Sequence, residues 1–513
     1  MNKTKILTLS LLSASSLFLA QLKSNITVVD NPPKTIVSKH IYGHFAEHLG
    51  RGIYDGIYVG ENSTIPNKSG VRKDIINALK ELNIPNLRWP GGCFADTYHW
   101  QDGIGPKKDR PEIVNRWWGG VSEDNSFGTH DFLNFAKEIG AEPYLAGNLG
   151  SGEVKELSDW VTYVNGEAKS PMVDLRKKNG QEKPWTVKYW GVGNEMWGCG
   201  GNMTPEFYAN LYRQYATFMT DWTNSDKLFR IASGANIDDY HWTEVMMRDI
   251  PKNLIEGVAL HAYSFPNWDK KGDAVDFDEG LYFATMKTAL RMDELVTKHS
   301  GIMDKYDPEK KIALVVDEWG GWYEVEKGTN PGFLYQQNTM RDAMIAGTTL
   351  NIFNQHSDRV RMANLAQTVN VLQAVILTKG EKMLLTPTYH VLNLYKAHQD
   401  AELVPLKIDS PDYTFNGDKL KAVSASATKK EGVTTLSLVN IDSKKSVEVS
   451  IDNKAFASKK VTAKILTSKK LQDHNTFDQP NAIVPVEFKK FKSSNGKLTT
   501  ELPPFSVVVF TIN

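Results

Sequence analysis

The segment KIALVVDEWGGW, residues 311–322, decides the fold class of this chain. Residues 312–316 within it are apolar and rich in β-branched side chains, which is typical of a strand buried on both faces of a parallel sheet. Asp317 and Glu318 follow directly, so the sequence predicts carboxylates at the edge where this strand ends. The segment YWGVGNEM, residues 189–196, has the same arrangement, because a predicted strand at 188–192 is followed closely by Glu195.

Apolar runs of this kind alternate with helix-like segments between residues 37 and 395. The eight predicted strands are 41–46, 86–89, 142–146, 188–192, 230–234, 257–261, 313–317 and 349–353. The predicted helices include 71–82, 130–139, 205–222, 282–299 and 336–346, and Thr204 before Pro205 is a typical helix start. Strand followed by helix, eight times over, predicts a (β/α)₈ barrel. A doubly wound open sheet is disfavoured, because no glycine-rich dinucleotide loop follows the first strand.

The pattern of the sequence changes beyond about residue 396. Short segments rich in Val, Thr and Ser, at 434–440, 446–451, 461–466 and 506–512, are separated by polar residues and lack helical periodicity. This pattern predicts an antiparallel β-sandwich over residues 396–513. Residues 24–29 have the same strand-like pattern, so we expect residues 24–36 to add a strand to that sandwich.

The N-terminal residues are typical of a signal peptide. Lys3 and Lys5 precede an apolar stretch at 6–20 that is too short for a comfortable membrane span. We therefore expect residues 1–22 to be a signal peptide and the protein to be secreted or periplasmic. The alternative is an uncleaved anchor, because bulky Phe18 leaves the cleavage site undefined.

Charge and cysteine content narrow the function classes. Lys plus Arg equal Asp plus Glu, at 60 each, so the formal net charge gives no support for nucleic acid or an acidic membrane as a partner. The two cysteines, Cys93 and Cys199, both follow predicted strand ends. A disulfide between them is compatible with that placement, but spacing alone cannot establish it. Without a nearby histidine cluster we expect no metal site and no cofactor.

Five predicted strand ends carry polar or aromatic side chains, and in a parallel barrel such ends share one rim, where active sites lie. Two carboxyl groups, one as proton donor and one as nucleophile, are the catalytic groups that cleave a glycosidic bond. Arg88 and Tyr263 are candidates for keeping a nucleophile ionised. Burial beside Trp197 would raise the pKa of a proton donor at Glu195. Asn194 could hydrogen-bond a sugar 2-hydroxyl.

Several long segments resemble the α-L-arabinofuranosidases of glycoside hydrolase family 51. They include IYGHFAEHLGRGIYDGIYVG, LRWPGGCFADTYHWQDGIGP, NSFGTHDFL, YWGVGNEMWGCGGNMTPEFYA, LHAYS, DEWGGWY and RMANLAQTVNVLQ. The likeness extends from about residue 24 to the C-terminus. It implies a clan A (β/α)₈ barrel with a C-terminal β-sandwich. The implied enzyme is exo-acting and retaining, and it releases terminal arabinofuranosyl residues from arabinoxylan, arabinan or arabino-oligosaccharides.

The resemblance also implies roles for individual residues. It makes Glu195 the general acid/base and Glu318 the nucleophile. Trp117 or Trp118 would lie near the leaving group. The substrate-binding residues that it implies are Glu47, Arg88, Cys93, Asn194, His261, Tyr263, Gln367 and Trp118.

Two segments, EMWGCGG and RWWGGVSEDNSFG, depart from the simplest members of the family on the aglycone side, which leaves the substrate preference open. An endo-acting β-1,4-glucanase or xylanase on the same scaffold is one alternative. A non-catalytic carbohydrate-binding protein is another, disfavoured because a pure binder needs neither glutamate. The resemblance further suggests a homo-oligomer, either a trimer or a hexamer.

Overall fold

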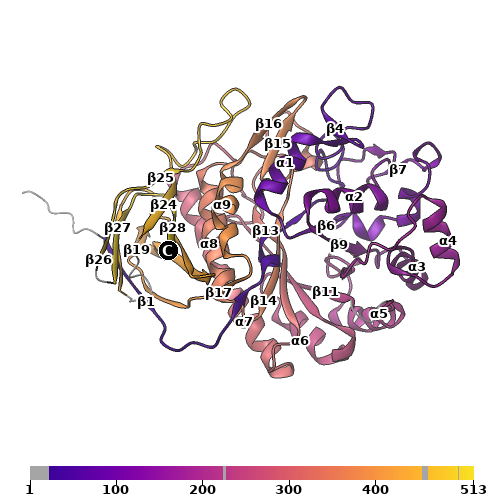
Figure 1. The fold of residues 1–513 in the computed structure, drawn as a ribbon, viewed down its shortest axis with the longest axis horizontal. Coiled ribbons are helices and arrows are strands. Elements are labelled where there is room, and N and C mark those ends of the chain that lie inside the picture. Colours follow the sequence, from indigo (N-terminus) through magenta and orange to yellow (C-terminus); the bar gives the residue numbers. More distant parts are fainter. Residues whose placement is uncertain (1–21, 223–226, 453–459, 495) are drawn as a thin grey trace, which may run out of the picture.

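The computed structural model describes residues 22–222, 227–452, 460–494 and 496–513 (Figure 1). The predicted signal peptide, residues 1–22, therefore lies outside the described residues except for Leu22. Within the described ranges no helix has the length and apolar character that a membrane span requires.

Eight parallel strands close into a barrel, which confirms the predicted fold class. In the order in which they pair around the barrel they are β10 (Tyr189–Val192), β11 (Phe229–Asn236), β12 (Gly257–Ser264), β13 (Ala313–Gly321), β14 (Val360–Ala366), β3 (Gly43–Phe45), β6 (Asn86–Trp89) and β9 (Glu142–Gly147). All of the predicted strands except the last overlap one of these.

The described helices follow the strands around the outside of the barrel (Figure 1). They are α1 (Lys73–Leu82), α2 (Thr129–Ile139), α3 (Val154–Asn165), α4 (Pro171–Lys178), α5 (Pro205–Phe218), α6 (Tyr240–Asp249), α7 (Glu279–Tyr306), α8 (Met340–Gln355) and α9 (Pro387–Tyr395). Several begin as their sequence predicts. At α5, for example, the Thr204 side chain caps the helix and proline occupies its first turn.

The predicted strand at 349–353 is wrong, because these residues lie inside α8 and the eighth strand is β14. Every residue from Met340 to Asn354 is buried, since α8 packs against β13 on one side and against the C-terminal strands β21 (Val423–Lys430) and β22 (Val433–Asn440) on the other. A helix buried all round loses its amphipathic period. Its Thr- and Ile-containing second half therefore resembled a short buried strand.

Strand β13 extends to Gly321, so Glu318 lies within the strand and not beyond its end. The pairing register shifts on both sides of it, between Ala259 and His261 of β12 and between Val316 and Trp319 of β13. In a regular strand successive side chains point to opposite faces, and a bulge re-aims them. The irregularity lets Asp317 and Glu318 both contact the interior of the barrel mouth.

The C-terminal strands form two further sheets that pack beside α8 and α9 (Figure 1). Tyr282 of α7 also reaches this domain, because its hydroxyl donates to the Ile441 carbonyl. One sheet has the order β18 (Leu406–Asp409), β1 (Leu22–Val28), β23 (Val447–Asp452), β27 (Lys497–Leu502) and β26 (Phe491–Ser494). The other has the order β2 (Ile36–Val37), β17 (Ala401–Leu403), β21, β22, β28 (Ser506–Ile512), β24 (Val461–Leu466) and β25 (Val486–Glu487).

The N-terminal strand β1 joins the first of these sheets although it is distant in sequence. It pairs antiparallel with β18 and parallel with β23. Its alternating burial, with Ser24 and Ile26 inside, is typical of a strand with one solvated face. The described part of the chain thus starts with a strand of the C-terminal domain and then crosses to the barrel.

Candidate active site

Glu195 and Glu318 face each other at the carboxyl ends of the barrel strands. Their nearest ligand-type oxygens, together with a ring nitrogen of His261, all lie within 4.8 Å of one another. Glu195 follows β10 in a sharp turn, with φ of 83° at Gly193 and 42° at Glu195 itself. Such a left-handed conformation is uncommon for a residue with a side chain. The turn brings the carboxylate back over the barrel mouth.

Glu318 accepts two strong hydrogen bonds, one on each carboxylate oxygen. Arg88 of β6 donates from Nη1 at 2.9 Å, and the hydroxyl of Tyr263 of β12 donates at 2.8 Å. Arg88 also donates from Nη2 to Oδ1 of Asn194 at 2.6 Å. Arg88 is held in place, because it is 2 % exposed and its guanidinium lies 4.6 Å from the centre of the Phe45 ring. The two donors therefore fix the orientation of the Glu318 carboxylate.

Glu195 has a different environment. Burial and then the charge of Glu318 raise the pKa of Glu195, although His261 and Arg88 oppose this shift. Nδ1 of His261 lies 2.9 Å from Oε1 of Glu195, and Nε2 lies 3.1 Å from Oδ1 of Asp317. Burial opposes the protonation of His261, yet Glu318, Asp317 and Glu195 together raise its pKa to about 10. The imidazole is therefore a cation between carboxylates, and it donates to both.

Glu47 connects three loops of the rim. Its Oε1 accepts the backbone N–H groups of Gly92 and Phe94 and the indole N–H of Trp118, at 3.0, 3.1 and 2.9 Å. Its Oε2 accepts from Nε2 of Gln367 at 3.0 Å. Burial and the neighbouring Glu318 raise the pKa of Glu47 to about 7. Glu47 is thus a fixed acceptor at the edge of the pocket.

Two glycines let these acidic groups approach each other. A Cβ on Gly91 would lie 2.5 Å from Cγ of Glu47, and one on Gly92 would lie 2.8 Å from Oε1 of Glu318. Real Cβ atoms do not approach so closely, so the PGG turn after β6 requires glycine for lack of space. This lack of space explains why two glycines follow Pro90, where the sequence alone indicates only a turn.

A two-stranded hairpin, β7 (Ile113–Val114) and β8 (Ser122–Glu123), carries the tryptophan pair. The structure places Trp118 against Glu47, whereas Trp117 is 36 % exposed. At the base of the hairpin, Nδ1 of His48 lies 3.2 Å from Glu123, and Asn115 donates to the His48 carbonyl at 2.6 Å. This buried network fixes the hairpin to the end of β3.

Asp96 is a functional candidate that the sequence did not reveal. Its buried carboxylate accepts the backbone N–H groups of Leu149, Gly150 and Asn194 at 2.8, 2.9 and 2.9 Å. Burial raises the pKa of Asp96 to about 7. The contact with Asn194 positions the turn that presents Glu195. Asp96 lies within a segment that resembles the family, but neither its type nor its spacing marks it as different from an ordinary loop residue.

Cys93 and Cys199 form a disulfide between the loops after β6 and β10. The sulfurs lie 3.9 and 3.5 Å from Oε2 of Glu195. The structure thus brings all the site residues predicted from the sequence, His261 included, to one rim of the barrel.

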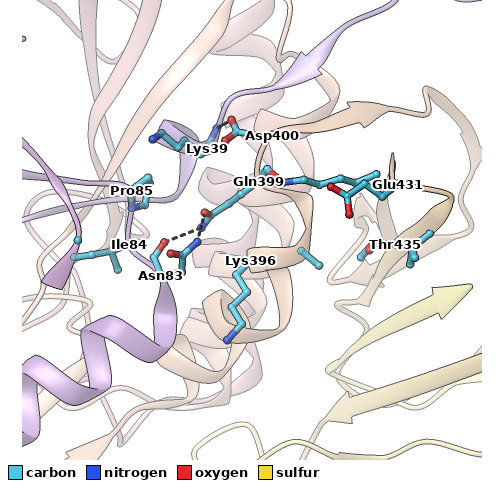
Figure 2. Close-up of a pocket in the computed structure, with 13 residues that line it drawn as sticks. Lys39, Asn83, Ile84, Pro85, Lys396, Gln399, Asp400, Glu431 and Thr435 are labelled. Atoms are coloured by element: carbon cyan, nitrogen blue, oxygen red, sulfur yellow. Dashed lines mark hydrogen bonds between the residues drawn. The ribbon is translucent and has the colours of Figure 1, made fainter. Parts of the chain in front are cut away.

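A cavity of about 470 Å³ lies elsewhere, beside Pro85 at the amino end of β6 (Figure 2). Its polar groups bond one another: Asn83 and Gln399 exchange hydrogen bonds, and the backbone N–H of Lys39 donates to Asp400. None of the predicted site residues lines it. The amino end of a barrel is generally the stabilising face, so this cavity is not the active site.

A closed parallel barrel with two facing glutamates at its mouth defines a glycoside hydrolase. The sequence matches two family models, the α-L-arabinofuranosidase 1 domain over residues 78–278 and the α-L-arabinofuranosidase C-terminal domain over residues 317–506. The chain belongs to the α-L-arabinofuranosidases of glycoside hydrolase family 51.

Individual relatives agree with this assignment. An intracellular exo-α-L-arabinofuranosidase of Bacteroides ovatus is 49 % identical over 99 % of this chain and 100 % of its own. The GH51 arabinofuranosidase structure from Xanthomonas axonopodis pv. citri is 48 % identical, with a TM-score of 0.94 over 96 % of this chain and 100 % of its own. A Thermotoga maritima α-L-arabinofuranosidase in complex with arabinose is 31 % identical, with a TM-score of 0.83 and the same coverage. A Paenibacillus polymyxa xyloglucanase, at 11 % identity, shares the fold alone.

The Bacteroides ovatus relative also corrects one expectation. It is named intracellular and matches this chain almost from end to end, so the predicted secreted or periplasmic location is wrong and a signal peptide finds no support. The prediction depended on a short basic head and an apolar run, with no defined cleavage site. Such a run is a weak signal because apolar N-terminal segments serve other purposes.

Proposed function

We propose that this enzyme releases terminal α-L-arabinofuranosyl residues by double displacement, with Glu318 as nucleophile and Glu195 as general acid/base. The observation that carries the proposal is the approach of the two carboxylates to within 4.8 Å. Retaining glycosidases hold this pair about 5–5.5 Å apart, whereas inverting ones need about 6.5–9.5 Å to admit a water molecule between them.

In the first step a carboxylate oxygen of Glu318 attacks the anomeric carbon while the glycosidic C–O bond breaks. Arg88 and Tyr263 orient that carboxylate by one hydrogen bond to each of its oxygens. The leaving oxygen takes the proton from Glu195, the carboxyl whose pKa is raised by burial and by the charge of Glu318. The product of this step is a covalent arabinosyl ester of Glu318.

In the second step Glu195, now a carboxylate, removes a proton from water as the water attacks the anomeric carbon. His261 stabilises this ionised form, because its cationic ring donates to Oε1. The ester bond breaks, Glu318 regains its charge, and the sugar leaves with its original configuration.

The sugar hydroxyls are bound by groups whose hydrogen bonds are incomplete. Oε1 of Gln367 is buried and has no hydrogen-bond partner among the described residues, so it can accept a hydrogen bond from a sugar hydroxyl. Asn194 uses its oxygen for Arg88, and its Nδ2 makes only a long contact of 3.9 Å with Sγ of Cys199, so a second N–H is left for the substrate. Glu47 accepts a further hydroxyl, and the Trp118 ring that donates to it borders the leaving-group side.

The same proposal covers the broader organisation. Residues 37–395 carry the catalytic barrel, and residues 396–513 with 24–36 form the sandwich. The natural substrates are arabinose-bearing side chains of arabinoxylan or arabinan and their oligosaccharides. Assembly into a trimer or hexamer remains a prediction, which light scattering of the purified protein tests.

The deciding experiment follows hydrolysis of p-nitrophenyl α-L-arabinofuranoside by proton NMR. The proposal expects turnover with the α-anomer of arabinose as the first product, before mutarotation. Initial release of the β-anomer would contradict double displacement. Cleavage of a β-1,4-glucan or xylan without action on the aryl arabinoside would favour the endo-acting alternative, and binding without turnover would favour a non-catalytic protein.

A further inference from the structure

The two cysteine sulfurs and Glu195 converge on one point beside the pocket. Oε2 of Glu195 lies 3.9 Å from Sγ of Cys93 and 3.5 Å from Sγ of Cys199. Among the described residues no nitrogen or oxygen donor bonds this oxygen, because His261 uses only Oε1. All three side chains of the cluster are half-buried, so solutes can reach them.

This cluster has the spacing of a metal site. The two sulfurs and a carboxylate oxygen lie within 4.8 Å of one another, and the ligand atoms of a tetrahedral zinc ion lie about 3.3–3.8 Å apart. While Cys93 and Cys199 are bonded to each other, neither can act as a thiolate ligand. Breaking the bond leaves two thiols and a free carboxylate oxygen close together, and the two sulfurs then have to move apart to reach the spacing of zinc ligands.

A second set, Glu195, His261 and Glu318, is equally compact but chemically unsuited. Both ring nitrogens of His261 already face carboxylates, Nδ1 toward Glu195 at 2.9 Å and Nε2 toward Asp317 at 3.1 Å. An imidazole that donates a proton from each nitrogen has no lone pair for a metal. Cation binding at this rim therefore depends on the sulfurs.

We propose that reduction of the Cys93–Cys199 disulfide creates a binding site for a divalent cation of the zinc class. The protein ligands are the two thiolates and Oε2 of Glu195, and water completes the tetrahedron. Thiolate with carboxylate suits zinc and its heavier congeners better than magnesium or calcium. Because Glu195 is the proposed acid/base, the bound cation removes it from proton transfer and stops turnover. The inhibition rests on the proposed function, whereas the binding does not.

The chemistry balances with a phosphine as reductant. The S–S bond breaks, each sulfur gains a hydrogen, and the phosphine with one water becomes the phosphine oxide. On metal binding each thiol releases one proton, Glu195 releases its proton where it carries one, and both sulfurs and one carboxylate oxygen donate electron pairs to the cation. Cytosolic thiols are kept reduced, and one relative of this chain is named intracellular, so the reduced state is relevant to this family.

The test compares the full-length protein before and after phosphine treatment, with the phosphine removed under anaerobic conditions. Cadmium is the spectroscopic probe, because thiolate-to-cadmium charge transfer absorbs in the ultraviolet. We expect one cadmium per reduced chain, with this absorption, and none per oxidised chain. Zinc should inhibit the reduced enzyme at a concentration at least about 100-fold lower than the oxidised one, since the oxidised form lacks two of three ligands. A chelator should restore activity.

Two variants make the result specific. Cys199→Ser removes one ligand and the disulfide, so its zinc sensitivity should not respond to phosphine. Glu195→Gln keeps both sulfurs, so its reduced form should still show cadmium–thiolate absorption with weaker binding. Equal zinc inhibition of oxidised and reduced wild type would overturn the proposal, as would a folded protein in which phosphine exposes no thiol. Stoichiometric cadmium binding without loss of turnover would support the metal site and count against Glu195 as the acid/base.

Discussion

Replacing His261 by glutamine should move the alkaline limb of the kcat/KM profile to higher pH. In the free enzyme this limb reports loss of the proton from Glu195. The cationic ring of His261 lies 2.9 Å from Oε1 of Glu195 and favours the ionised carboxylate. Without this cation the carboxyl holds its proton more firmly, so the general acid survives to higher pH.

The size of the shift follows from the short distance. Two unit charges about 4 Å apart interact by about 4 kcal/mol at an effective dielectric constant of 20, which corresponds to about 3 pKa units. Glutamine keeps a neutral donor that can still reach the carboxylate, and this recovers part of the interaction. We therefore expect the limb to rise by about 1–2 pH units.

The assay needs an aryl arabinofuranoside with a weakly acidic phenol, so that protonation of the leaving oxygen limits the rate. His241→Gln is the matched control, because His241 is an exposed histidine that pairs only with Glu206 on the barrel exterior. Its profile should coincide with that of the wild type. A His261→Gln limb that stays in place, or moves to lower pH, would refute the assignment of His261 as the cation that lowers the pKa of Glu195.

Three further expectations concern the neighbours of the two glutamates. Tyr263→Phe removes one hydrogen-bond donor from Glu318 and should lower kcat about 10- to 100-fold in correctly folded protein. An unchanged kcat would show that this hydrogen bond does not assist the nucleophile. Burial raises the pKa of Asp96 to about 7, so between about pH 4 and 7 the native chain holds a proton that the unfolded chain has lost. Stability should then fall as pH rises through this window, by up to ~1.4 kcal/mol per pH unit, and Asp96→Asn should flatten that slope in denaturant titrations. Glu123→Gln weakens the hydrogen bonds at the base of the tryptophan hairpin. It should raise KM for arabino-oligosaccharides about 3- to 10-fold with little change in kcat. A change confined to kcat would contradict a role of Glu123 in positioning the hairpin.

The sequence predicted the barrel because strands buried on both faces leave unbroken apolar runs, and Glu195 and Glu318 stand out at the ends of two of them. The same rule failed at α8. Packed between barrel and sandwich, this helix is buried all round, including polar residues such as Arg341 and Asn351, so its sequence has no clear amphipathic period to detect. The local pattern of apolar residues therefore identified the strands of the barrel. It failed for the second half of α8, a helix that is buried between two domains.

The finer geometry of the site depends on contacts that local pattern does not contain. The register shifts around β13 place Asp317 and Glu318 on the same side, yet they arise from pairing with β12 and β14. Trp118 and Gln367 meet on Glu47 from positions 71 and 320 residues away in the chain. The resemblance to a known family named candidate site residues, and the fold shows that these lie together at one rim and that Trp118 is the tryptophan of the pair that contacts Glu47.

The most direct test of the central claim is azide rescue of Glu318→Ala and Glu195→Ala on p-nitrophenyl α-L-arabinofuranoside. Azide should occupy the space of the lost nucleophile in Glu318→Ala and yield the β-configured arabinosyl azide. In Glu195→Ala it should attack the covalent intermediate without a general base and yield the α-configured azide. Opposite anomers from the two variants would establish both roles. The same anomer from both, or the reverse assignment, would contradict the account.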